Sequence, residues 1–194
     1  MNARPSINLS DSSIHVLFVG NSLTYANNLP LIVSELAKEK GINIKTEMIA
    51  RPNYALEDHW NDRKLEMQLM TNKYDFVIIQ QGPSSQMDGR MMLAEYGLKI
   101  KTLCEKYNAR LVFFMVWPAL SNFQTFDDII KNYTDAASVT NSILCPVGVA
   151  WKNYFVETKD YSYYGPDQFH PSKKGSEAAA KIIVDTLLHN FNHP

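Results

Sequence analysis

The sequence predicts an α/β fold in which helices cover both faces of a parallel sheet. Two observations carry this prediction. Short apolar segments alternate along the chain with longer segments of helical periodicity, and such alternation is typical of parallel strands joined by crossover helices. Residues 14–19 also form an apolar run without a polar alternation, as expected of a strand that is buried on both faces.

Strands are expected at five places along the chain. We place them at residues 14–19, 42–49, 75–79, 109–116 and 143–149. Apolar and polar residues alternate in the second of these strands, so we expect it near an exposed edge of the sheet. The fourth is strongly apolar and is expected in the centre of the sheet, where Trp117 and Pro118 end it.

Helices are expected between these strands and after the last of them. Their predicted ranges are residues 29–40, 55–70, 90–107, 123–140 and 173–191. Gly41 is expected to end the first helix, because glycine is the usual residue just beyond a helix C-terminus. The second helix gathers its apolar side chains near one face. Gly165 and Pro166 break the chain shortly before the last helix.

The bulk composition is that of an ordinary globular protein. The chain has 194 residues, which suits a polar N-terminal segment of residues 1–13 and one domain over residues 14–194. Apolar residues make up 45% and the net charge is -1, so nothing favours a nucleic-acid partner. No apolar run approaches the roughly 20 residues that span a bilayer. We therefore expect a soluble protein, either cytoplasmic or, if a signal peptide was removed, periplasmic or secreted.

Two short segments near opposite ends of the chain carry the candidate chemistry. Gly20-Asn21-Ser22 follows the first predicted strand, and Asp167 stands three residues before His170. A serine hydroxyl is a poor nucleophile at neutral pH, so it needs a base, and the base needs an acid that holds its tautomer. Ser22, His170 and Asp167 supply these three parts. Taken alone, Ser22 would be interpreted as a helix cap.

Together these segments resemble the motifs of the SGNH (GDSL-like) hydrolases. The first motif of that family is a Gly-Asp-Ser or Gly-Asn-Ser turn, matched by residues 20–22. The last is Asp-x-x-His, often followed by Pro-Ser and a glycine, matched by residues 167–172 and Gly175. The resemblance spans nearly the whole chain, although the middle matches poorly. It implies a flavodoxin-like three-layer α/β/α fold with a five-stranded parallel sheet in the order 2-1-3-4-5, and a ligand beyond the carboxyl ends of the strands.

Four other histidines compete with His170 for the role of base. His15 begins the first strand, away from its carboxyl end, and His59 lies in a helix, where a packing role is expected. His189 and His193 lie in the C-terminal helix and tail. Only His170 has an acid three residues before it and a helix start directly after it.

The oxyanion hole is where the sequence departs from the family pattern. The backbone N–H of Ser22 is the first expected donor, at the start of a short helical turn. The resemblance aligns Asn53 with a glycine whose backbone N–H is a second donor in the family. Asparagine is the non-glycine residue that best tolerates a positive φ, so this backbone role can survive the change. An ordinary loop asparagine is the alternative.

The third motif of the family places an asparagine side chain after the third strand, but residues 80–85 read QQGPSS here. This stretch resembles the Gln-Gly-Glu-Ser-Asn segment of SGNH relatives that remove acetyl groups from sugars. We therefore expect the Gln81 amide to be the third donor, with the hydroxyl of Ser84 or Ser85 as the alternative. Loss of one donor would cost on the order of 2.7–4 kcal/mol of transition-state stabilisation.

Aromatic residues gather near the strand ends where the cleft is expected. They are Tyr25, Tyr54, Trp117, Tyr161, Tyr163 and Tyr164. Rings of this kind stack on sugar faces, so Tyr54 and Trp117 are predicted to contact a carbohydrate substrate. For any single ring, an ordinary core or surface position is the alternative.

The sequence thus predicts a serine esterase that cleaves a short acyl ester, with acetyl as the first choice, on a small molecule or a carbohydrate. A lysophospholipase or thioesterase of the same fold and a non-catalytic carbohydrate-binding relative are the alternatives. The two cysteines, Cys104 and Cys145, are expected to be buried apolar thiols. Neither a metal nor another cofactor is expected, because the sequence lacks CxxC, HExxH, calcium-loop, GxGxxG and Walker A motifs.

Overall fold

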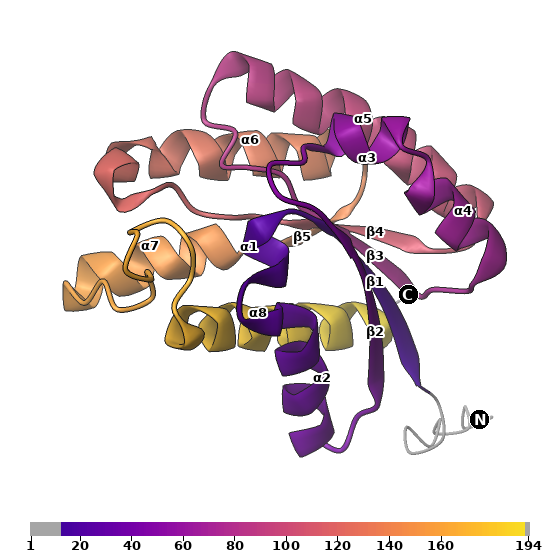
Figure 1. The fold of residues 1–194 in the computed structure, drawn as a ribbon, viewed down its shortest axis with the longest axis horizontal. Helices are drawn as coiled ribbons and strands as arrows, with labels where there is room; N and C mark the ends of the chain where they lie inside the picture. Colours follow the sequence, from indigo (N-terminus) through magenta and orange to yellow (C-terminus); the bar gives the residue numbers. More distant parts are fainter. Residues whose placement is uncertain (1–12, 193–194) are drawn as a thin grey trace, which may run out of the picture.

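The computed structural model describes residues 13–192, in which a five-stranded parallel sheet lies between layers of helices (Figure 1). The strands are β1 (Ile14–Gly20), β2 (Ile44–Ala50), β3 (Phe76–Ile79), β4 (Arg110–Phe114) and β5 (Ile143–Cys145). Their order is β2-β1-β3-β4-β5 and all neighbouring pairs are parallel. The predicted fold class and strand order are therefore confirmed. Residues 1–12 of the predicted polar N-terminal segment, and His193 in the tail, lie outside the described residues.

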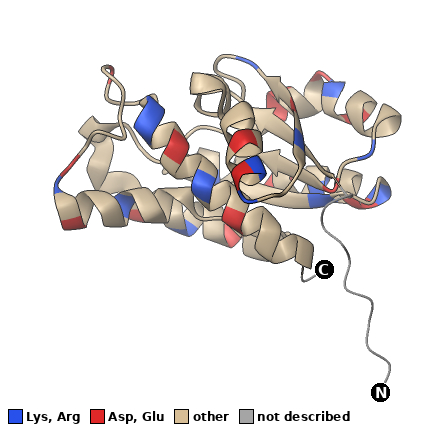
Figure 2. Ribbon diagram, turned by 90° about the horizontal axis from the view of Figure 1, so that it is seen from below, with Lys and Arg blue, Asp and Glu red and all other residues tan. Residues whose placement is uncertain are grey.

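Helices cover both faces of the sheet (Figure 1). One face carries α2 (Leu29–Glu39) and α8 (Lys173–Asn192), which pack against each other. The other carries α3 (Leu56–Asn61), α4 (Lys64–Thr71), α5 (Met87–Lys106) and α6 (Phe126–Val139). The short helix α1 (Ser22–Tyr25) follows β1, and α7 (Val147–Thr158) packs against α6 and α8. Figure 2 shows charges of both signs interspersed over the helices on the α2 and α8 side.

The core lies along the central strands. Every residue of β3 is buried, as are all but one of β1, because helices cover both faces of these strands. The strand β2 is different: only Ile44 is buried, and Met48 is 41% exposed. The prediction that the second strand lies at an edge of the sheet is confirmed.

The register of the sheet brings the ends of β1 and β3 together. Val19 is the partner of Ile79, and the backbone N–H of Gln80 donates to the carbonyl of Val19 at 2.9 Å. Gln80 therefore lies beside Gly20, and Gly20 directly precedes the turn that carries Ser22. This juxtaposition places the segment after β3 against the candidate nucleophile.

The predicted helix boundaries hold best where a residue enforces them. Gly41 has a φ of 74°, and its N–H donates to the carbonyl of Lys38 at 2.9 Å. The N–H of Ile42 donates to Ala37 at 3.0 Å, which completes the turn that ends α2. A left-handed φ is easy for glycine and strained for most other residues, so Gly41 ends the helix as expected.

Two predicted elements are wrong in part. The helix expected over residues 55–70 is divided into α3 and α4, because Arg63 takes a left-handed conformation (φ 58°) and the carboxylate of Asp62 accepts from the N–H of Lys64. The strand expected over residues 143–149 ends at Cys145. Pro146 then stands at the N-cap of α7, a helix whose valines and aromatic residues were interpreted as part of a strand or left unassigned.

Both cysteines are buried and free, as predicted. Burial raises the pKa of each thiol to about 12, so neither is a nucleophile at neutral pH. Among the helices of residues 13–192, none combines the length and the apolar character that a bilayer crossing requires. The same residues contain no cluster of three or more His, Cys, Asp or Glu side chains suited to a metal ion.

Candidate active site

The nucleophile turn, residues 21–28 with the candidate nucleophile Ser22, lies at the carboxyl end of β1. Asn21 caps α1 with an extended backbone, and its side-chain oxygen accepts the N–H of Leu23 at 3.1 Å. Ser22 is the first residue of α1 and is half-buried, while its neighbours Asn21 and Leu23 are buried. The cap therefore holds Ser22 at the carboxyl end of β1, with its side chain partly exposed.

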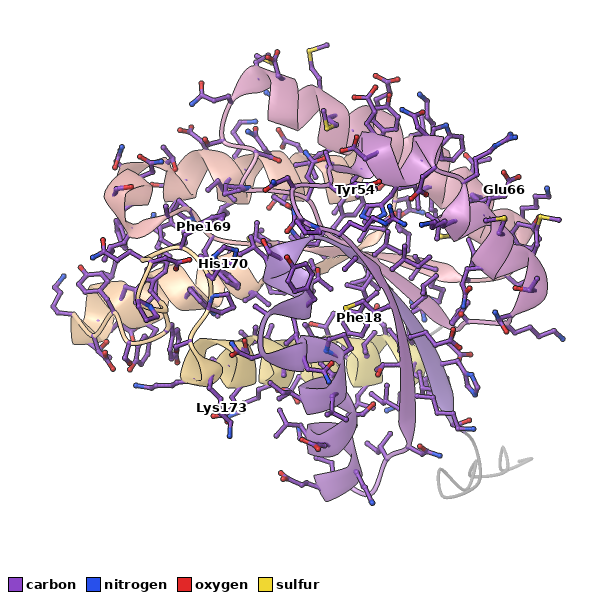
Figure 3. The ribbon with its side chains drawn as sticks, viewed as in Figure 1. Phe18, Tyr54, Glu66, Phe169, His170 and Lys173 are labelled. Atoms are coloured by element: carbon purple, nitrogen blue, oxygen red, sulfur yellow. The ribbon has the colours of Figure 1, made fainter. Side chains whose placement is uncertain are left out.

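The base loop, residues 159–172, runs from α7 to α8 and is fastened to the end of β4. Tyr164 and Pro171 form an antiparallel bridge, and the N–H of Gly165 donates to the carbonyl of His170 at 2.7 Å. The indole N–H of Trp117 donates to the carbonyl of Phe169 at 3.0 Å. Figure 3 shows Phe169 and His170 on this loop, which approaches α1. These backbone contacts fix the position of the imidazole.

Ser22, His170 and Asp167 form one hydrogen-bonded chain. Nδ1 of His170 lies 2.5 Å from Oδ2 of Asp167, and Nε2 lies 2.8 Å from Oγ of Ser22. A carboxylate can only accept, so Nδ1 carries the proton and Nε2 is the acceptor of the serine hydroxyl. This tautomer is the one that a general base requires. The structure thus brings together the three residues that the two motifs predicted.

The carboxylate of Asp167 is held in its charged form. Its Oδ2 accepts from the His170 ring, and its Oδ1 accepts the backbone N–H groups of Phe169 (3.0 Å) and His170 (2.9 Å). The hydrogen bond with the His170 ring, followed by the N–H of Phe169, holds the pKa of Asp167 below its ordinary value. Asp167 therefore remains an anion at neutral pH, and the same bonds orient it.

One side chain ties the nucleophile turn to the base loop directly. Nδ2 of Asn27 donates to the carbonyl of Pro171 and to Oγ of Ser176, both at 2.9 Å. Asn27 has a φ of 53°, a conformation that asparagine tolerates better than most residues. This contact joins the segment after Ser22 to the start of α8. Neither periodicity nor motif spacing in the sequence indicates this contact.

Two backbone N–H groups are available for an oxyanion. Asn53 lies in the turn after β2 with a φ of 60°, in which the N–H of Tyr54 donates to Arg51 at 3.3 Å. Pro52 and a left-handed Asn53 at its centre are typical of a type II turn. Within residues 13–192, the N–H groups of Asn53 and Ser22 have no hydrogen-bond acceptor. The positive φ agrees with the alignment of Asn53 to a glycine.

Asn53→Gly is expected to keep kcat for an ester substrate within about threefold of the parent, because glycine retains the N–H and adopts the same φ without strain. Steady-state kinetics with p-nitrophenyl acetate measures this. If the Asn53 side chain is itself a donor, the same variant should lose roughly 10²-fold or more in kcat. A loss of that size would contradict the backbone role.

The side chain of Gln81 is occupied elsewhere. It is buried, and its two amide hydrogens go to Oγ of Ser84 (2.7 Å) and to the carbonyl of Gly89 (3.0 Å). Neither hydrogen is left for an oxyanion, so this arrangement does not support the predicted donor role. The hydroxyl of Ser84 donates to Gly82 at 2.8 Å and is also committed. Of the predicted alternatives, only Ser85 has a hydroxyl without a hydrogen-bond partner among the described residues.

Of the two residues predicted to contact the substrate, Trp117 is buried and Tyr54 is partly exposed. Trp117 is fully buried, and its ring stacks on Trp151 with 3.6 Å between centroids. A substrate cannot reach it, so that prediction is wrong; Trp117 instead holds the base loop through Phe169. Tyr54 (Figure 3) is half-buried beside Asn53. The guanidinium of Arg51 lies 5.6 Å from its ring centroid. Tyr54 stays a candidate for substrate contact.

His59 is a packing residue, as expected, but it packs against the site. Its Nε2 donates to the carbonyl of Gly20 at 2.8 Å, and its ring is buried in edge contact with Tyr54. Burial lowers its pKa, so it stays neutral. His15 contacts Ser13 at the opposite end of the sheet. Neither histidine competes with His170 for the serine.

Comparisons with known proteins support the same assignment of the fold. No family model and no curated protein matches the sequence. A candidate SGNH hydrolase from Slackia heliotrinireducens has a TM-score of 0.76 at 22% identity, covering 91% of this chain and 100% of its own. The lipase/acylhydrolase from Enterococcus faecalis has a TM-score of 0.73 at 15% identity, covering 91% of this chain and 96% of its own. The acetyl xylan esterase AlAXEase has a TM-score of 0.73 at 17% identity, covering 90% of this chain and 100% of its own. The chain therefore has the fold of the SGNH hydrolases, as its two motifs predicted.

Proposed function

We propose that this protein is a serine esterase that removes a short acyl group, most simply acetyl, from a carbohydrate. The observation that carries the proposal is the hydrogen-bonded chain from Ser22 through His170 to Asp167, assembled at the carboxyl edge of the sheet from residues 148 positions apart. A buried structural serine has no need of an oriented imidazole and a paired carboxylate. Nucleophilic catalysis needs both.

The geometry supports a two-step mechanism. Nε2 of His170 takes the proton as Oγ of Ser22 attacks the ester carbonyl, and Asp167 stabilises the imidazolium that forms. The N–H groups of Ser22 and Asn53 are the proposed donors to the oxyanion, with the Ser85 hydroxyl as a third. His170 then protonates the departing alkoxide, which leaves an acyl group on Ser22. A water activated by the same imidazole hydrolyses that acyl-enzyme.

The openness of the site supports a bulky alcohol. The side chains of His170 and Asp167 are 40% and 53% exposed, so the leaving-group side of the site faces solvent. Tyr25, three residues after Ser22, is 36% exposed, and Tyr54 stands beside Asn53. An acetyl xylan esterase and an acetyl-xylooligosaccharide esterase from Geobacillus have the same fold, with TM-scores of 0.73 and 0.63. These observations favour an acetylated saccharide.

A long-chain acyl ester is the second candidate, because the Enterococcus faecalis neighbour is described as a lipase/acylhydrolase. A series of p-nitrophenyl esters from acetate to palmitate separates the two. We expect kcat/KM to be highest for acetate and to fall as the chain lengthens, and acetate release from acetylated xylo-oligosaccharides to follow. A maximum at eight carbons or more would favour the second candidate, and no turnover of any ester would favour a carbohydrate-binding protein.

A further inference from the structure

The side chain of Gln80 is the centre of the hydrogen bonds around the nucleophile turn. Its Oε1 accepts the backbone N–H of Asn21 (3.0 Å) and the hydroxyl of Thr24 (2.7 Å). Its Nε2 donates to Oδ1 of Asn21 (3.0 Å) and to the carbonyl of Gln81 (2.5 Å). Both lone pairs and both hydrogens are used, and the residue is 1% exposed. Asn21 and Thr24, its hydrogen-bond partners, stand on either side of Ser22 in the sequence.

These hydrogen bonds continue from the nucleophile turn to the turn of residues 51–54, which contains Asn53. Oδ1 of Asn21 accepts from Gln80 and from Leu23, while Nδ2 of Asn21 donates to the carbonyl of Tyr54 at 3.0 Å. Tyr54 follows Asn53 directly, so the Asn21 amide joins the two turns that carry the proposed oxyanion donors. Gln80 fixes which way that amide faces, because its Nε2–H can bond only to the oxygen of Asn21.

Gly20 provides the space for this arrangement. A Cβ at Gly20 would lie 2.5 Å from Oε1 of Gln80 and 2.3 Å from Oγ1 of Thr24, closer than packed atoms tolerate. Gly20 does not take a positive φ, so it is required for room rather than for a turn conformation. The glycine, the glutamine and the threonine form one packed unit behind Ser22.

We infer that Gln80 is a positioning residue for the proposed ester hydrolysis, which acts through Asn21 to hold the N–H groups of Ser22 and Asn53 at the separation that an oxyanion requires. The inference rests on the proposed function. In this view, the segment after β3 contributes through Gln80, which places backbone donors. Gln81 has no amide hydrogen left to donate. Among the described residues, the Gln80 side chain makes no hydrogen bond with Oγ of Ser22.

Gln80→Glu is the sharpest variant, because it keeps the shape of the side chain and its acceptor oxygen but replaces the NH₂ group with oxygen. The new oxygen would face Oδ1 of Asn21 and the carbonyl of Gln81, which are acceptors, so the Asn21 amide should turn away. We expect kcat for p-nitrophenyl acetate to fall roughly 10- to 100-fold while KM changes less than about threefold, since misplaced oxyanion donors act on the transition state. Phosphonylation of Ser22 by a fluorophosphonate should slow in parallel.

A matched threonine pair keeps the test independent of folding. Thr24→Val removes one hydroxyl that donates to Gln80, and Thr140→Val removes one that donates to the carbonyl of Ala136. Both threonines are buried, but Thr140 follows α6 at the opposite end of the sheet. We expect Thr24→Val to lower kcat roughly three- to tenfold and Thr140→Val to leave it within about twofold, at a temperature where circular dichroism shows both folded.

Each outcome decides the inference. It is overturned if Gln80→Glu and Thr24→Val both keep kcat within about twofold of the parent, or if Thr24→Val and Thr140→Val lower it equally. If Gln80→Glu does not fold, the threonine pair gives the decision. A parent protein that reacts with neither p-nitrophenyl acetate nor a fluorophosphonate overturns the proposed function and this inference together. An active parent in which Gln80→Glu and Thr24→Val are both equally active overturns the inference alone.

Discussion

Replacing Ser22 by alanine is expected to lower kcat for p-nitrophenyl acetate by at least about 10⁴-fold, because no other hydroxyl can take the place of the nucleophile. Oγ of Ser22 lies 2.8 Å from Nε2 of His170, and removing it leaves the imidazole without a proton to accept. The fold should persist, since the hydroxyl makes no other hydrogen bond among the described residues and the cap of α1 is formed by Asn21. Steady-state kinetics and circular dichroism measure the two effects.

A second serine provides the control. The hydroxyl of Ser34, in α2, donates to the carbonyl of Ile44 at 2.7 Å and has no hydrogen bond with Ser22, Asp167 or His170. Ser34→Ala should therefore keep kcat within about twofold of the parent. A fluorophosphonate should label Ser22 in the parent, as mass spectrometry of the labelled peptide can establish. Labelling of a different serine, or full activity in Ser22→Ala, would refute the assignment.

Removing the base is expected to be more harmful than neutralising the acid. His170→Ala should lower kcat by about 10⁶-fold and Asp167→Asn by about 10⁴-fold, since the imidazole transfers the proton while the carboxylate orients it. In Asp167→Asn the amide can donate to Nδ1 of His170, which would move the imidazole proton to Nε2 and block its acceptance of the Ser22 proton. The structure supports this reading because, within residues 13–192, the hydrogen bonds of the Asp167 carboxylate go to the side chain of His170 and to nearby backbone.

The ranking is measured by kcat across a range of pH, with His15→Ala as the matched control. His15 contacts Ser13 at the amino end of β1, so its loss should leave kcat within about twofold. Equal or greater loss in Asp167→Asn than in His170→Ala at every pH would contradict the roles given to the two residues. A large loss in His15→Ala would show that activity depends on stability rather than on the base.

The sequence predicted those parts of the structure that a local pattern determines. The strands were found because buried parallel strands are apolar throughout, and the end of α2 because Gly41 alone suits its conformation. The triad was found because Ser22 and the Asp167–His170 pair each carry a local motif. By contrast, α7 was missed because its valines and aromatics fit a strand as well as a helix, and only Pro146 marked its start.

The remaining parts of the site depend on contacts between distant segments. Gln80 and Gln81 are adjacent in the sequence, and nothing in their composition says which amide faces the nucleophile turn. The pairing of Val19 with Ile79 decides it, because it sets Gln80 beside Gly20. The burial of Trp117 likewise follows from packing against Trp151, a residue of the helix that the sequence did not reveal.

The separation of the catalytic partners has a consequence for the order in which the protein becomes active. Ser22 and His170 lie 148 residues apart, and Asn27 joins the first turn to the beginning of α8. During synthesis, at about 5–20 residues per second, the nucleophile emerges well before the imidazole exists, so a partial chain carries an inert serine. We expect the proposed hydrolysis to begin only when the last helix has docked. The appearance of turnover during synthesis or refolding can therefore serve as a direct signal that the whole chain has reached its native topology.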